Sequence, residues 1–246
     1  MYELVAAQYF WSTLNTICPG ADALPDMSFG FGPARQHQAP AAWHPFELPP
    51  VRDDFDAPAL AFSWISPRRR PDDTWSLNRR PGWLTLTATG AGLDEPGHTF
   101  LGRRQQHPDC RAAVRVAPGS GRAGLSVRMD EAHHYDIEVA GGVVSVVARI
   151  GPVRQRIADH PVPPGPVTLA VDIRTADVGA RGPDTLAFSM EGPEGTILLA
   201  ELDGRYLSTQ VAGGFTGRVI GMYVTGGSAA FDWFDYDPTV RQQPEM

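Results

Sequence analysis

Carboxylates at alternate positions are the first feature of this sequence that could do chemistry. Asp136 and Glu138 flank Ile137, and in an extended strand they share one face while Ile137 points to the other. Paired carboxyl groups can serve as general acid and general base. His133 and His134 precede them and, being adjacent, point to opposite faces, which is poor geometry for a common metal ion. The pattern favours a polar strand face over a catalytic set.

Motifs of several other chemistries are absent from the chain. All 21 basic residues are Arg, so a phosphate-cradling loop that ends in Gly-Lys is excluded, and no Gly-x-Ser-x-Gly elbow occurs. The two cysteines, Cys18 and Cys110, are too few for a disulfide framework or a Cys-rich zinc site. The formal charge of −7 disfavours nucleic acid. No apolar run approaches the roughly 20 residues that span a bilayer, so we expect neither a nucleic acid nor a membrane as partner.

The elements that must position these side chains are strands, from residue 52 onward. Leu84, Leu86 and Ala88 alternate with threonines, the pattern of a half-buried strand. Similar stretches follow, separated by turns rich in Gly and Pro. They cover residues 113–116, 124–129, 135–139, 143–148, 167–173, 185–190, 196–200, 218–224 and 229–236. About ten or eleven short strands, with no recurring helical pattern between them, predict an all-β domain built as a two-sheet sandwich or a barrel.

The ends of the chain differ from this strand-rich region. Residues 1–44 show no sustained period of 2 or 3.6 residues, which predicts an irregular N-terminal segment. Residues 45–51 are rich in Pro and are expected to form a stiff linker. The sandwich is assigned to residues 52–238 and a tail to residues 239–246. Because the N-terminus lacks the basic stretch of a signal peptide, a cytoplasmic location is expected.

A set of short motifs runs in order along residues 52–238. They are RDDFD (52–56) followed by Trp64, RPGWLTL (80–86), FLGRRQ (100–105), AGLSV (123–127), VIGMY (219–223) and AFDWFDY (230–236). In this order the set resembles the C-terminal concanavalin A-like domain of glycoside hydrolase family 43 β-xylosidases and α-L-arabinofuranosidases. The resemblance covers most of the chain. It implies a jelly-roll β-sandwich of two antiparallel sheets.

The resemblance also implies a division of labour. In those enzymes an N-terminal five-bladed β-propeller carries the catalytic carboxylates, and the sandwich packs beside it. The 44 residues that lead this chain are too few for such a propeller. We therefore expect no catalytic residues here, but an accessory module that assists sugar binding or docks onto a catalytic propeller. The expected partners are xylan- or arabinan-derived oligosaccharides and such a propeller.

Residues 98–107 hold the side chains best suited to a sugar site or an interface. By resemblance this stretch lies near the face that meets the propeller. An aromatic ring can stack on a sugar ring, and Arg or Gln can donate to sugar hydroxyls. The predicted sugar-binding or interface residues are Phe100, Arg103, Arg104, Gln105 and His107, together with His134. The alternative is that Phe100 belongs to the core and the two arginines to a solvated strand edge.

Aspartates gather near both ends of the sandwich region. They are Asp53, Asp54 and Asp56 at the start and Asp232, Asp235 and Asp237 at the end. The first and last strands of a jelly roll often pair, which would bring these oxygens together, and hard oxygen ligands suit Ca²⁺. A structural calcium ion at Asp53 and Asp235 is therefore one expectation, and no other cofactor is expected. The alternative is that these carboxylates cap turns and face solvent.

Two further functions stay open from the sequence. The chain could be a free-standing carbohydrate-binding protein of lectin type, or a glycosidase with a site in the sandwich that no motif reveals. Glycoside hydrolysis needs two positioned carboxyl groups, and the sequence shows no recognisable arrangement of them. Whether the chain is an enzyme is left open at this point.

Overall fold

The computed structural model of the chain describes residues 51–68, 74–176, 182–214 and 217–238. The irregular segment expected for residues 1–44, residues 45–50 of the expected linker and the tail at 239–246 lie outside the described residues. All of the described residues belong to one unit of the chain, Leu48–Met246. None of the helices that they form is long and apolar enough to cross a membrane.

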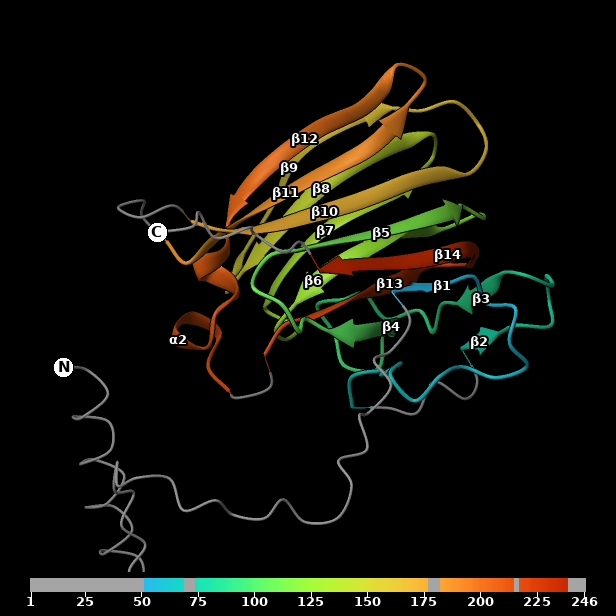
Figure 1. Cartoon of the computed structure of the whole chain (residues 1–246), viewed down its shortest axis with the longest axis horizontal. Coiled ribbons are helices and arrows are strands. Elements are labelled where there is room, and N and C mark those ends of the chain that lie inside the picture. The colour runs from blue at the N-terminus through green and yellow to red at the C-terminus, as the bar shows by residue number, and fades with distance from the viewer. Residues whose placement is uncertain (1–50, 69–73, 177–181, 215–216, 239–246) are drawn as a thin grey trace, which may run out of the picture. The chain divides into compact units, whose positions relative to one another are not determined.

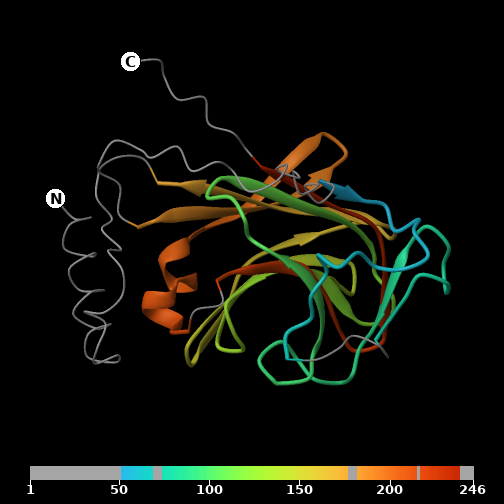
Figure 2. The same ribbon diagram turned by 60° about the horizontal axis from the view of Figure 1, so that its bottom comes forward.

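Two antiparallel sheets lie face to face (Figure 1, Figure 2). The eight-stranded sheet runs in the order β12 (Gly195–Asp203), β11 (Asp184–Gly192), β10 (Val167–Thr175), β5 (Cys110–Ala117), β14 (Ser228–Pro238), β3 (Leu84–Thr87) and β2 (Trp75–Ser76), with β1 (Arg52–Asp53) also paired to β14. The six-stranded sheet runs in the order β4 (Thr99–Arg104), β13 (Val219–Thr225), β6 (Arg122–Arg128), β7 (His133–Ala140), β8 (Val143–Ile150) and β9 (Val153–Pro161). Two short helices, η2 (Gly204–Leu207) and α2 (Thr209–Ala212), follow β12. The predicted all-β sandwich of two antiparallel sheets is confirmed.

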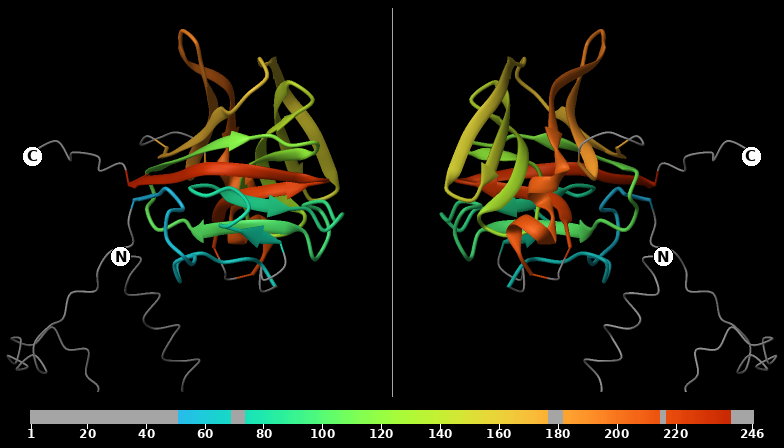
Figure 3. Two further views of the ribbon diagram at one scale, coloured as in Figure 1. Left: turned by 90° about the vertical axis from the view of Figure 1, so that its right-hand side faces the viewer. Right: turned by 90° about the vertical axis from the view of Figure 1, so that its left-hand side faces the viewer.

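The first and last strands of the domain pair, as expected for a jelly roll. Arg52 of β1 lies opposite Asp235 of β14, and Asp53 lies opposite Phe234. At the other side of the sandwich the edge strands β9 and β12 of the two sheets come together. Figure 3 shows the hairpins β8–β9 and β11–β12 standing near each other at this end.

Alternate residues of the strands fill the space between the sheets with apolar side chains. In β7 these are Tyr135, Ile137 and Val139, each no more than 1% exposed. They pack in one cluster with side chains of the facing sheet such as Val114 and Phe231. Because side chains alternate along a strand, the residues between them, including Asp136 and Glu138, point away from this core. The expectation that these two carboxylates share one face is confirmed.

The face of the six-stranded sheet that points away from the core, called here the outer face, is partly covered. Residues 88–98 connect β3 of one sheet to β4 of the other and pass over it. Leu93 of this segment packs with Phe100, Val219 and Tyr223 in a small second apolar cluster. The covering segment therefore buries polar strand residues that would otherwise meet solvent.

Candidate binding site

A tyrosine and a carboxylate meet across a glycine in the middle of the outer face. Gly124 of β6 lies opposite Tyr223 of β13 on one side and opposite Glu138 of β7 on the other. Because Gly124 has no side chain, the Tyr223 hydroxyl reaches across and donates to Glu138 Oε2 at 2.6 Å. Tyr223 is 1% exposed and Glu138 is 2% exposed. The local sequence thus places a buried carboxylate on a sheet face rather than in the core.

Arg122 completes the surroundings of this carboxylate. Its guanidinium forms an ion pair and hydrogen bond with Glu138 Oε1, so protein donors engage both oxygens of Glu138. Burial raises the pKa of Glu138, and the hydrogen bonds from Tyr223 and Arg122 oppose that rise. Burial and the nearby carboxylate also raise the pKa of Tyr223 well above its ordinary value. With both oxygens engaged, Glu138 is held in place by the fold.

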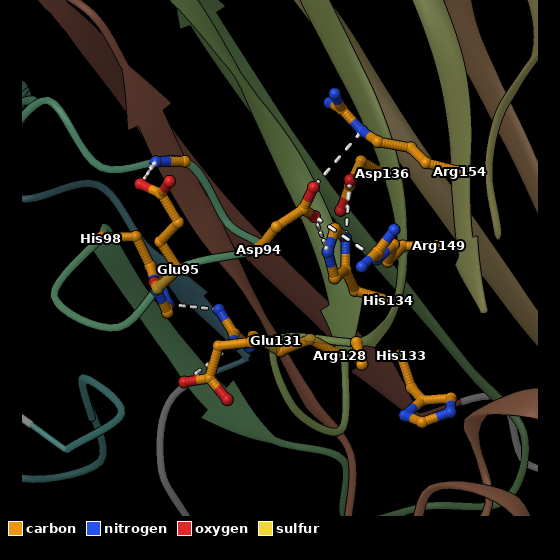
Figure 4. Close-up of polar contacts among 12 residues, drawn as sticks. Asp94, Glu95, His98, Arg128, Glu131, His133, His134, Asp136, Arg149 and Arg154 are labelled. Carbon is orange, nitrogen blue, oxygen red and sulfur yellow. Dashed lines mark hydrogen bonds and ion pairs between the residues drawn. The ribbon is translucent and has the colours of Figure 1, made fainter. Parts of the chain in front are cut away.

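A histidine between two carboxylates lies one step further along β7 (Figure 4). His134 Nδ1 is 2.8 Å from Asp136 Oδ2, and His134 Nε2 is 2.9 Å from Asp94 Oδ1. Burial alone would lower the pKa of His134, but the charge of Asp136 and the hydrogen bonds to Asp136 and Asp94 raise it overall. The arrangement therefore favours an imidazolium that donates from both ring nitrogens.

A second buried pair joins the covering segment to β6 (Figure 4). The guanidinium of Arg128, 2% exposed, donates to His98 Nε2, while His98 Nδ1 donates to the carbonyl oxygen of Glu95 at 2.6 Å. Burial and the charge of Arg128 lower the pKa of His98. Neutral His98 therefore accepts from Arg128, and this contact fixes the covering segment on the sheet.

A cavity of about 230 Å³ opens beside these groups. Its polar lining comes from Asp94, Arg122, Asp136, Glu138, Arg154, Tyr223 and Thr225, and Leu93 adds an apolar wall. Asp136 is only 1% exposed, yet its Oδ1 has no hydrogen-bond partner within the described residues. Arg154 Nε lies 3.8 Å from Asp94 at the rim. The cavity therefore presents both donors and acceptors, with one acceptor free.

Two of the predicted sugar or interface residues are interior. Phe100 is 1% exposed and packs in the second apolar cluster, so its ring has no face open to a sugar. Arg103 is 6% exposed. Its Nη2 donates to Ser63 Oγ at 3.0 Å, and its guanidinium lies 5.1 Å from the ring centroid of Trp64. Both residues hold the sheet edge together in this structure.

The other predicted residues divide between the surface and the site. Arg104 and His107 are exposed, and half-buried Gln105 donates from Nε2 to the His107 carbonyl oxygen at 3.0 Å. The structure does not bring these three residues to the cavity. His134, by contrast, contacts Asp94 and Asp136, which both line it. The segment 98–107 and the cavity are thus separate features.

Asp53, one of the two aspartates expected to hold calcium, is engaged in local contacts. Asp53 Oδ1 accepts from the Phe55 backbone N–H at 2.9 Å, and its Oδ2 accepts from Trp64 Nε1 at 2.8 Å. Asp235 lies on the paired strand opposite Arg52, and its buried Oδ1 has no hydrogen-bond partner in the described residues. Among the residues that the structure describes, no three Asp, Glu, His or Cys side chains gather as a metal-binding group. Asp53 therefore caps a turn and anchors an indole, which is the alternative that the sequence left open.

Four residues of the cavity have no signal in the sequence: Asp94, Arg122, Arg154 and Tyr223. Asp94 comes from the irregular covering segment, and the others come from three different strands of one sheet. The alternation of His134, Asp136 and Glu138 with apolar residues marked a polar face. That face is buried by a segment some 40 positions away in the sequence. The alternation of polar and apolar residues within one strand cannot predict which distant segment covers it.

The fold and the site together define a concanavalin A-like β-sandwich with a polar pocket on one outer face. The family described as the β-xylosidase C-terminal concanavalin A-like domain, of glycoside hydrolase family 43, matches residues 52–237. A non-reducing end α-L-arabinofuranosidase of family 43 from Bacteroides ovatus is 32% identical over 203 residues, which are 76% of this chain and 37% of that protein. This chain belongs to the family of C-terminal concanavalin A-like domains of family 43 β-xylosidases.

Solved structures agree with this assignment. The Bacteroides ovatus xyloglucan-locus GH43B superposes with a TM-score of 0.71 at 30% identity, over 80% of this chain and 41% of that one. A xylan β-1,4-xylosidase from Bacillus halodurans C-125 gives a TM-score of 0.67 at 28% identity, over 80% and 40% of the two chains. The chain thus spans less than half the length of these relatives.

Proposed function

We propose that this sandwich is a non-catalytic accessory module of a family 43 glycoside hydrolase, which packs beside a catalytic β-propeller and assists its action on xylan- or arabinan-derived sugars. The observation that carries the proposal is the extent of the match. Residues 52–237 correspond to the C-terminal domain of enzymes of which this chain covers 37–41%. Those relatives are named for arabinofuranosidase and xylosidase activity.

The carboxylates of the sandwich support a role outside catalysis. Retaining and inverting glycosidases need two carboxyl groups free to exchange protons or attack the sugar. Protein donors engage both oxygens of Glu138, and Asp136 Oδ2 is held by His134. These contacts suit a fixed polar wall better than an acid and base pair.

A chimaeric enzyme tests the proposal. The C-terminal sandwich of the Bacteroides ovatus arabinofuranosidase is replaced by residues 52–238 of this chain, and hydrolysis of 4-nitrophenyl arabinofuranoside and xyloside is compared with that of the propeller alone. We expect the chimaera to be more active and more stable than the isolated propeller. A chimaera that performs no better than the propeller alone would overturn the docking role.

The intact chain without a propeller serves as the control in the same assay. We expect no turnover above the buffer rate. Turnover by the purified chain would replace the accessory role with an enzymatic one, the third function left open by the sequence. Tight binding of sugars without any effect on a propeller would instead favour the free-standing lectin-like function, which the polar cavity makes the second candidate.

A further inference from the structure

We propose that the cavity on the outer face of the six-stranded sheet binds a single neutral sugar ring, with Asp136 Oδ1 accepting from a sugar hydroxyl and Arg154 donating to another. The proposal rests on the carbohydrate-related role given above and names a site for it. The site is separate from the segment 98–107, to which the sequence pointed. The volume, the free acceptor and the charge balance of the cavity support this site.

The volume of the cavity fits one ring. The volume of about 230 Å³ is several times the roughly 30 Å³ that one water molecule occupies in the liquid. That is the space of a monosaccharide and not of an oligosaccharide. A longer chain would place one terminal ring inside and leave the rest in solvent.

The free acceptor points to a ligand that donates hydrogen bonds. Asp136 lines the cavity and is 1% exposed, and its buried Oδ1 has no hydrogen-bond partner in the described residues. A buried polar atom left unpaired is unfavourable. Ser126, opposite Asp136 on β6, has a buried Oγ that is likewise unpartnered. Ser126 does not line the cavity, so the acceptor that a sugar hydroxyl can satisfy there is Asp136.

The balance of charge selects a neutral ligand. Asp94, Asp136 and Glu138 are carboxylates that would repel an anion, and Arg122 and Arg154 are guanidinium groups that would repel a cation. His134 between Asp94 and Asp136 adds further positive charge to the set. A ligand without net charge is repelled by neither the carboxylates nor the guanidinium groups, and it can form hydrogen bonds with both.

The apolar wall of the cavity matches the apolar faces of a sugar ring. Leu93 lines the cavity and packs with Tyr223 in the second apolar cluster. A pyranose or furanose ring has C–H faces that this wall can cover while its hydroxyls meet the carboxylate and guanidinium groups. The mixture of one apolar wall with convergent polar groups is that of small-molecule sites in general.

Binding is measured on the intact chain by amide chemical shifts in NMR spectra, with four sugars that are neutral, cationic or anionic. D-xylose and D-glucose are neutral, D-glucosamine is cationic and D-glucuronate is anionic. With each sugar raised to about 50 mM, we expect shifts for the neutral sugars only, at amides near Gly124, Asp136 and Tyr223, with a Kd on the order of millimolar. Equal shifts with all sugars, or shifts confined to other parts of the sheet, would overturn the site.

Two variants and one control make the assignment specific. Asp136→Asn removes the anionic acceptor with little change of shape, and Arg154→Ala removes a donor from a side chain that is 51% exposed. Each is expected to weaken xylose binding by about tenfold or more. Asp54→Asn, at an exposed carboxylate far along the chain, leaves affinity unchanged. Undiminished binding by Arg154→Ala and Asp136→Asn, with native spectra, contradicts the proposal.

This experiment and the chimaera fail independently. The NMR titration uses no propeller, and the chimaera needs no sugar in the sandwich cavity. Binding without an effect on the propeller keeps the sugar site and rejects the accessory role. An active chimaera whose sandwich shows no shift with any sugar keeps the accessory role and rejects the site.

Discussion

Replacement of Tyr223 by Phe removes one hydroxyl and leaves the ring in its apolar cluster. The lost hydrogen bond is the 2.6 Å contact to Glu138 Oε2, between groups that are 1% and 2% exposed. A hydrogen bond to a charged group contributes about 1.5–3 kcal/mol. Because Arg122 still pairs with Oε1, we expect Tyr223→Phe to lower the free energy of unfolding by about 2 kcal/mol at pH 7. In a domain of this size that lowers Tm by about 4–8 °C.

The cost of Tyr223→Phe depends on the charge of Glu138. Burial raises the pKa of Glu138 in the folded state, so the folded protein binds this proton more tightly than the unfolded chain. Protonation of Glu138 therefore stabilises the fold at low pH, and that contribution is lost as pH rises through the folded pKa. The Tyr223 hydroxyl favours the charged carboxylate. The destabilisation by Tyr223→Phe is therefore largest above the folded pKa and smaller below it.

Urea denaturation followed by Trp fluorescence measures this difference at pH 7 and at pH 4.5, the ordinary pKa of Glu. Tyr206→Phe is the matched control, because Tyr206 is 39% exposed, and we expect it to change stability by less than about 0.5 kcal/mol. A loss for Tyr223→Phe as small as that of the control would refute the buried contact. An equal loss at both pH values would refute its dependence on the carboxylate charge.

Two other predictions use the same denaturation assay. Phe100→Ala should lower the free energy of unfolding by about 3–5 kcal/mol, because the ring is 1% exposed in its cluster. The control Arg104→Ala, at an exposed position, should change the free energy of unfolding by less than about 0.5 kcal/mol. Similar losses for both variants would show that Phe100 is not a core residue. His134 has a folded pKa above 6.5, so its stabilising charge is fully present below pH 6.5 and is lost as pH rises through the folded value. His134→Gln should flatten that decline in stability, and an unchanged pH profile would contradict the imidazolium between Asp94 and Asp136.

The strands that sequence predicted best are those with one apolar face. Residues 135–139 and 143–148 fall inside β7 and β8, where every second side chain enters the core. β9 was missed, because Val153–Pro161 is exposed along almost its whole length and shows no apolar alternation. β4 was missed as a strand for the opposite reason. Phe100 and Leu101 are both buried, on different faces, so period 2 is hidden.

Only part of the candidate site could be predicted from the sequence. The side-chain period alone placed Asp136 and Glu138 together on one face and His133 and His134 on opposite faces, and the structure agrees. The roles expected for Phe100 and Arg103 rested on the family resemblance and on residue type, and neither can tell an exposed aromatic ring from a buried one. Burial of both faces of a sheet requires a segment that covers the outer face. Residues 88–98 have no sequence pattern that predicts this role.

The polar character of the outer face is the strongest reason to look for a ligand there. A buried sheet face is usually more stable with apolar side chains than with ion pairs, because desolvation offsets much of the attraction between charges. Here Arg128, His134, Asp136 and Glu138 are all 2% exposed or less. Arg128, His134 and Glu138 form hydrogen bonds within the fold, and so does one oxygen of Asp136, whereas its other oxygen is unpaired. Among the buried polar atoms without a partner, this oxygen belongs to a residue that lines the cavity, and the proposed sugar site gives it a hydroxyl donor.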